Sequence, residues 1–157
     1  MIDNLLSKTL VLGIGNPILK DDGIGLRVVE KLEGSFSDPR VTFLQTTLAG
    51  LNLLDLLSGF DRAIIVDAIQ TGGRLGQVYR FSPQDFMTRH EFPYLHNIDF
   101  FQTLLLGRML TENMPEKVVI VAIEVKDVSD FGEGLTPEVE SAIPDAVDQV
   151  LSELTNE

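Results

Sequence analysis

Four short runs of apolar residues, separated by helix-like segments, constrain the fold more than any other feature of this sequence. The runs have the length of strands and cover residues 9–14, 41–45, 63–66 and 118–125. The run at 63–66 is continuously apolar, as in strands that are buried on both faces of a sheet. The alternation predicts an α/β fold, a three-layer α/β/α sandwich with a mostly parallel sheet of about five strands. We expect one domain that spans residues 1–157.

The segments between the runs have the periodicity of amphipathic helices. Ile24, Val28 and Leu32 recur at every fourth position and form one apolar stripe. The final helix is predicted to begin with Thr136 as its N-cap, followed by a proline, and to be kinked at Pro144. Helices are predicted at residues 23–32, 51–57 and 97–110, and from residue 137 onward.

Two connections stand out between residues 70 and 96. Thr71-Gly72-Gly73 has the composition of a turn, so residues 77–81 are predicted to return as an antiparallel edge strand. Residues 82–95 form a long connection that contains two prolines. Connections of this length in compact domains are usually functional or mobile.

The charge balance excludes one class of partner and favours another. The chain carries 24 acidic and 12 basic residues, a net charge of −12. This field repels phosphate backbones, so nucleic-acid binding is not expected, whereas metal ions or a basic segment of a partner are attracted. The same charge also serves solubility.

Cysteine content and hydropathy exclude several kinds of site and indicate the cellular compartment. The chain has no cysteine, which excludes disulfides, thiolate metal sites and a cysteine nucleophile. The apolar runs are too short to span a membrane, and no basic stretch precedes an apolar one at the N-terminus as in a signal peptide. We therefore expect a cytoplasmic protein with no membrane partner.

Acidic residues and a histidine lie near the predicted carboxyl ends of the strands, where ligand sites gather in open α/β sheets. Two aspartates follow the first strand, one follows the third, and two carboxylates lie near the end of the last. The histidine stands at the head of the helix predicted at residues 97–110. These residues are Asp21, Asp22, Asp67, His96, Glu124 and Asp127.

Four of these residues, Asp21, Asp22, Asp67 and His96, also have a purely structural interpretation. Asp21 and Asp22 can cap the helix that follows, but one cap is enough; we expect Asp21 to accept an N–H from Gly23 or Ile24. The second carboxylate, Asp22, is then available as a cation ligand. A lone strand-end aspartate or helix-end histidine needs no function. Together, two carboxylates and one imidazole suit a divalent transition-metal ion and leave room for water or substrate.

Several other chemistries do not fit the sequence. Gly13 and Gly15 begin a dinucleotide fingerprint, but Ile18 occupies the position of its third glycine, and the aspartates that follow would repel a pyrophosphate. No Gly-x-Ser-x-Gly or His-Glu-x-x-His motif is present, and two histidines cannot make a three-histidine zinc site. We expect His90, in a polar segment, to be exposed to solvent.

Four motifs resemble those of the hydrogenase maturation endopeptidases, over about residue 9 to the end of the chain. The opening motif is LVLGIGN at residues 10–16, followed by DDGIG at 21–25. The second is IIVDA at 64–68, the third is His96-Asn97 before an apolar helix, and the closing segment is GEGLTP at 132–137.

The resemblance implies that Asp22, Asp67 and His96 bind a metal and carry the catalysis. In some family members the position of Asp22 is glutamate, so the shorter side chain here alters the placement of the metal. The implied protein is a nickel-dependent endopeptidase that removes the C-terminal propeptide from the nickel-loaded precursor of a [NiFe]-hydrogenase large subunit. Ni²⁺ would arrive with the substrate, Zn²⁺ or Cd²⁺ could substitute for it, and a monomer is favoured.

An O/N ligand set with open positions suits attack by water on a metal-polarised carbonyl. Two alternatives remain at this point. One is a non-catalytic nickel-sensing maturation chaperone that docks the same precursor. The other is a metallopeptidase of the related spore-germination type, which requires a longer chain with a propeptide.

Overall fold

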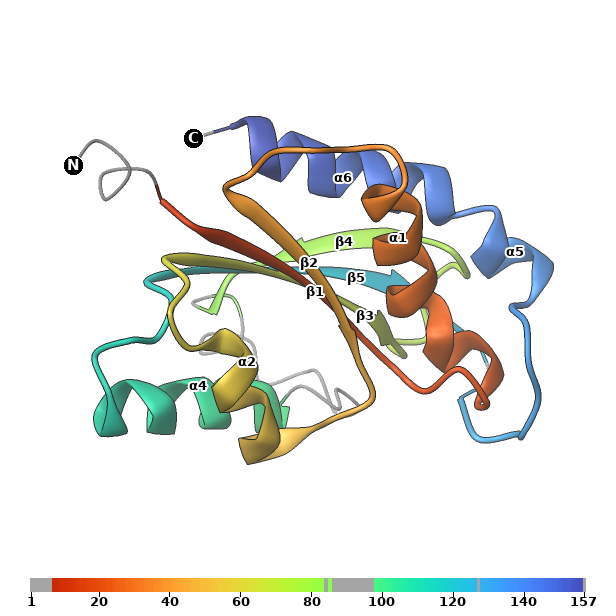
Figure 1. Ribbon diagram of the computed structural model, residues 1–157. Coiled ribbons are helices and arrows are strands. Elements are labelled where there is room, and N and C mark those ends of the chain that lie inside the picture. The colour runs from red at the N-terminus through yellow and green to blue at the C-terminus, as the bar shows by residue number, and fades with distance from the viewer. Residues whose placement is uncertain (1–6, 84, 86–97, 127, 157) are drawn as a thin grey trace.

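A five-stranded sheet forms the centre of the computed structural model, which describes residues 7–83, 85, 98–126 and 128–156. The strand order is β2-β1-β3-β5-β4; the first four strands are parallel, and β4 pairs antiparallel with β5 at one edge (Figure 1). The mostly parallel sheet and its antiparallel edge strand are as predicted. The strands are β1 (Thr9–Ile14), β2 (Val41–Thr46), β3 (Arg62–Ile69), β4 (Val78–Phe81) and β5 (Lys117–Glu124).

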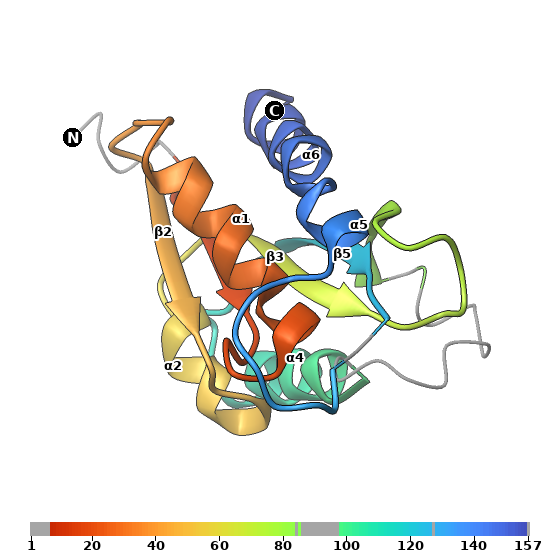
Figure 2. The same cartoon turned by 90° about the vertical axis from the view of Figure 1, so that its right-hand side faces the viewer.

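Helices cover both faces of the sheet, which confirms the three-layer α/β fold. On one face α1 (Ile24–Glu33) and α6 (Ile143–Thr155) lie side by side, as Figure 2 shows. The other face is covered by α2 (Leu54–Leu57) and α4 (Ile98–Leu110). Each face has its own buried apolar cluster, because successive side chains of a strand point to opposite faces.

One strand is longer than predicted and includes a residue that was expected to follow it. The strand predicted at 63–66 extends over Arg62–Ile69 as β3, so Asp67 lies inside it. Glu124 is the last residue of β5. The extension has a pairing reason: β3 and β5 stay in register as far as Ile69 opposite Glu124.

The predicted capping role of Asp21 is wrong. A 3-10 helix, η2 (Lys20–Gly23), precedes α1, and neither has a side-chain cap. The Asp21 carboxylate is fully buried and needs several donors. The N–H and the hydroxyl of Thr136 donate to it over 2.7 and 3.1 Å, and the N–H of Lys126 over 3.4 Å. The donors therefore come from the segment after β5, not from the helix that Asp21 begins.

The final helix begins where predicted but is interrupted instead of kinked. Thr136 occupies the N-cap position of α5 (Pro137–Glu140), although its hydroxyl bonds to Asp21 and makes no cap hydrogen bond. The helix ends at Glu140, and α6 begins at Ile143 with Pro144 in its first turn. A proline is tolerated there because the first-turn N–H groups have no partner within the helix.

Some predictions fall on residues that the structure does not describe. Most of the connection at 82–95, together with His90, His96 and Asp127, lies outside the described residues. Within the described ranges, no helix combines the length and the apolar character needed to cross a lipid bilayer.

The hydrogen bonds of Asp21 predict that Asp21→Asn destabilises the fold. Asparagine keeps one acceptor oxygen but turns an NH₂ group toward remaining donors, which leaves buried donors unsatisfied. We expect a loss of about 1–3 kcal/mol in the free energy of unfolding, measured by urea denaturation. The matched control is Asp148→Asn at an exposed position of α6, which should change stability by less than about 0.5 kcal/mol. Equal stabilities of the two variants would contradict the assigned role of Asp21.

Candidate metal site

Glycines allow the loop after β1 and the start of α1 to pack closely against the sheet. A Cβ atom on Gly15 would overlap the carbonyl oxygen of Asp22. A Cβ atom on Gly25 would overlap the carbonyl oxygen of Val66, the residue before Asp67. Only glycine permits such backbone approaches. The glycines of the opening motif therefore bring η2 against β3, where the two elements are in contact.

Asp22 lies in η2 and is held by its own loop. Its side chain is almost buried, with 9% of its surface exposed. The N–H of Asn16 donates to Oδ2 of Asp22 over 2.8 Å. This bond closes the loop between the two residues and fixes the orientation of the carboxylate at the carboxyl end of β1.

Asp67 is buried near the carboxyl end of β3, with 2% of its surface exposed. The N–H of Ala68 donates to its Oδ1 over 2.7 Å. Ile65 and Ile69, two residues to either side, belong to the cluster that also contains Phe100 of α4. By the alternation of the strand, Asp67 therefore points to the face of the sheet that α4 covers.

The contacts at the C-terminus of α4 show which way this helix runs along the sheet. Arg108, near the C-terminus of α4, donates to the carbonyl oxygens of Pro115 and Glu116, just before β5 begins. The C-terminus of α4 thus lies at the amino edge of the sheet, and its axis is about 20 Å long. The N-terminal end of α4 accordingly lies toward the carboxyl edge, as Figure 1 shows.

The structure brings Asp22 and Asp67 to one edge, whereas His96 lies outside the described residues. Among the residues that the structure does describe, no three His, Cys, Asp or Glu side chains gather closely enough to hold a metal ion. The three-residue ligand set therefore stays a prediction. Two nearly buried carboxylates at one edge match the O-ligand part of that set.

Glu124 reaches the same edge but has a structural task that sequence reasoning missed. It is 1% exposed. Its carboxylate accepts the N–H groups of Thr71 and Gly73, each over 2.8 Å, the hydroxyl of Tyr79 over 3.2 Å and the hydroxyl of Thr71. These donors occupy both oxygens, so Glu124 holds the turn between β3 and β4. The turn residues Thr71-Gly72-Gly73 were the only signal of this role in the sequence.

Comparisons with known proteins agree with the motifs. The family model of the hydrogenase maturation protease HycI matches residues 26–153. The hydrogenase expression/formation protein HupD of Bradyrhizobium diazoefficiens is 34% identical in an alignment that covers 94% of this chain and 79% of HupD. The hydrogenase 2 maturation protease of Escherichia coli K12 is 33% identical in an alignment that covers 94% of this chain and 90% of the relative.

A solved structure supports the same assignment. The hydrogenase maturating endopeptidase HybD from Escherichia coli superimposes with a TM-score of 0.79 and 31% identity, over 94% of this chain and 91% of HybD. The family model covers well over half of the residues. This chain belongs to the hydrogenase maturation protease family.

Proposed function

We propose that this protein is a nickel-dependent endopeptidase that removes the C-terminal propeptide from the nickel-loaded precursor of a [NiFe]-hydrogenase large subunit. The observation that carries the proposal is the delivery of two nearly buried carboxylates, Asp22 and Asp67, to one edge of a hydrogenase maturation protease fold. The reaction class is supported by two similar proteins, a hydrogenase 2 maturation protease and a hydrogenase maturating endopeptidase.

The proposed ligands of the substrate's nickel are Asp22, Asp67 and His96. Carboxylates that are buried near one another repel, and a divalent cation between them offsets that repulsion. An imidazole added to two carboxylates gives an O/N set that suits Ni²⁺ and also Zn²⁺ or Cd²⁺. The absence of cysteine excludes a thiolate from this set.

The residues of this chain orient the metal, and the metal supplies the Lewis acidity. When bound, the nickel carried by the precursor polarises the scissile carbonyl toward attack by water. The hydrogen bond from Asn16 keeps the Asp22 carboxylate in one orientation, and β3 fixes the position of Asp67. A rigid two-carboxylate edge places the bound metal, and with it the peptide bond, in a constant geometry.

The proposal predicts opposite outcomes for the two histidines. His96→Ala should abolish metal binding and lower the rate of propeptide release by more than about a hundredfold. Loss of a residue that only supports a metal ligand costs about 10–100-fold. His90→Ala is the matched control and should cleave at the wild-type rate. Cleavage of nickel-loaded precursor is followed by mass spectrometry of the released peptide. If His96→Ala cleaves at the wild-type rate, the imidazole takes no part in the chemistry. If the wild-type protein binds the precursor but does not cleave it, the chaperone alternative is favoured.

A second prediction separates activity from stability at Asp22. Asparagine at this position keeps an oxygen that can accept the N–H of Asn16, so the loop should stay closed. It removes the negative charge that a cation ligand needs. Because the acceptor of the Asn16 N–H is kept, we expect Asp22→Asn to lower the melting temperature by no more than about 2–4 °C, which corresponds to about 1 kcal/mol for a domain of this size, yet to lose propeptide release. If Asp22→Asn stays active, Asp22 is not a ligand.

A third prediction concerns the source of the metal. An open ligand set without thiolates holds free metal weakly, so precursor that lacks nickel should not be cut in the presence of a chelator. Addition of Ni²⁺ to the precursor before mixing should restore cleavage. Efficient cleavage of nickel-free precursor under strict chelation would refute the recognition of a substrate-borne metal.

A further inference from the structure

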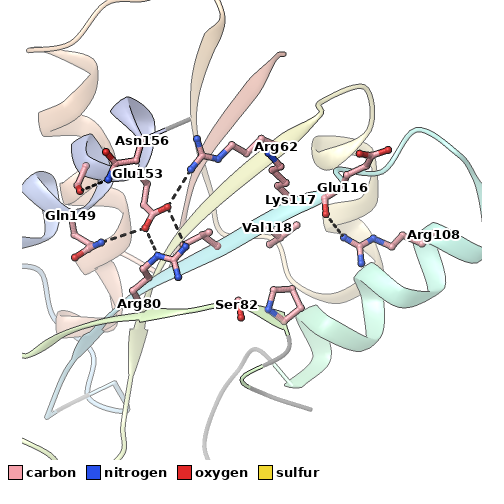
Figure 3. Close-up of a pocket in the computed structure, with 13 residues that line it drawn as sticks. Arg62, Arg80, Ser82, Arg108, Glu116, Lys117, Val118, Gln149, Glu153 and Asn156 are labelled. Atoms are coloured by element: carbon pink, nitrogen blue, oxygen red, sulfur yellow. Dashed lines mark hydrogen bonds and ion pairs between the residues drawn. The ribbon is translucent and has the colours of Figure 1, made fainter. Parts of the chain in front are cut away.

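A groove of about 630 Å³ lies at the amino edge of the sheet, at the opposite end of the strands from Asp67. Arg62 and Lys117, the first residues of β3 and β5, belong to its lining. Arg80 of β4 and Arg108 of α4 add two further cations. Four elements of the fold thus direct basic side chains to one place (Figure 3).

The charge of this groove is the reverse of the charge of the chain. The groove contains four of the 12 basic residues, and its only acidic lining residues among those described are Glu116 and Glu153. The whole chain carries twice as many acidic as basic residues. A negatively charged partner is therefore repelled by most of the protein and attracted to this groove.

One buried carboxylate arranges the cations at one end of the groove. Glu153 of α6 is 8% exposed; it accepts the Nη2–H of Arg62 over 3.2 Å and the Nε–H of Arg80. The side chain of Arg80 is still 48% exposed, so its guanidinium forms part of the groove surface. The ion pairs hold both guanidinium groups in place before any partner arrives, which lowers the entropic cost of binding.

Arg108 supplies a cation at the other end of the groove, as Figure 3 shows. Its Nη2 donates to the carbonyl oxygens of Pro115 and Glu116 over 2.9 and 3.3 Å. These acceptors are neutral, so they hold the guanidinium without cancelling its charge. Lys117 follows Glu116 in the chain, and its side chain is exposed to solvent.

We propose that this groove docks an acidic peptide segment of a protein partner. Its cations are distributed between two ends, which matches several carboxylates along an extended chain better than one small anion. Guanidinium groups bind carboxylates through paired hydrogen bonds, and Arg80 already displays this mode, since its Nε–H and Nη2–H donate to the two carboxylate oxygens of Glu153. A partner bound here leaves the edge with Asp22 and Asp67 open, so this docking is additional to the proposed cleavage.

The test measures binding of a fluorescent hexaglutamate peptide by anisotropy at low ionic strength. The double variant Arg108→Gln/Lys117→Gln removes two exposed cations and leaves the Arg62–Glu153–Arg80 cluster intact. We expect its affinity to be about fivefold weaker, as two exposed ion pairs together imply. Arg27→Gln/Lys31→Gln on α1 is the matched control, since both residues are exposed basic residues away from the groove, and it should bind like the wild type.

Folding and alternative ligands are checked in the same series. Both double variants should retain the wild-type melting temperature and release propeptide at the wild-type rate. If the first variant fails to fold, Lys117→Gln alone replaces it, with an expected loss of about twofold. The proposal is overturned if the groove variant binds the peptide as tightly as the wild type does. It is also overturned if both double variants lose the same affinity. Displacement of the peptide by inorganic phosphate at matched ionic strength overturns it in favour of a small-anion site.

Discussion

The buried carboxylate of Asp21 links an early segment of the chain to a late one. It accepts two hydrogen bonds from Thr136 and one from Lys126, so the loop after β1 is tied to the segment between β5 and α5. Backbone bonds between Gly132 and residues 18 and 20 extend the same junction. A charge at 0% exposure is tolerable only with such donors, so the junction must form for the protein to fold.

This junction divides the tasks of two adjacent aspartates. The three donors from the C-terminal segment engage both oxygens of Asp21, so Asp21 serves the architecture. Asp22, one residue later, is bonded within its own loop through Asn16 and lies where η2 meets β3. Because Asp21 stabilises the junction, the ligand role that we propose for Asp22 does not compete with it. A single aspartate could not supply both the junction and a cation ligand.

The local parts of the fold could be predicted from sequence, and the distant contacts could not. The apolar runs mark β1 and β5 because a doubly covered parallel strand buries nearly every side chain. The partner of Asp21 is 115 residues away, and the donors to Glu124 include Thr71, 53 residues away. No local pattern encodes such pairs, so a capping role was the nearest available interpretation of Asp21. The placement of Asp22 and Asp67 at one edge was predictable because the carboxyl ends of parallel strands share one edge.

The two edges of the sheet carry opposite chemistry, and the distance between them lets each act separately. Arg62 begins β3 in the cationic groove, and Asp67 lies five residues later, about 17 Å along the strand. Through solvent, charges this far apart are largely screened at physiological ionic strength, where the Debye length is about 8 Å. The proposed metal site at one edge and the proposed peptide site at the other therefore disturb each other little. The central strands are buried on both faces and carry ionisable residues only near their ends. One small sheet can therefore be negatively charged at one edge and positively charged at the other.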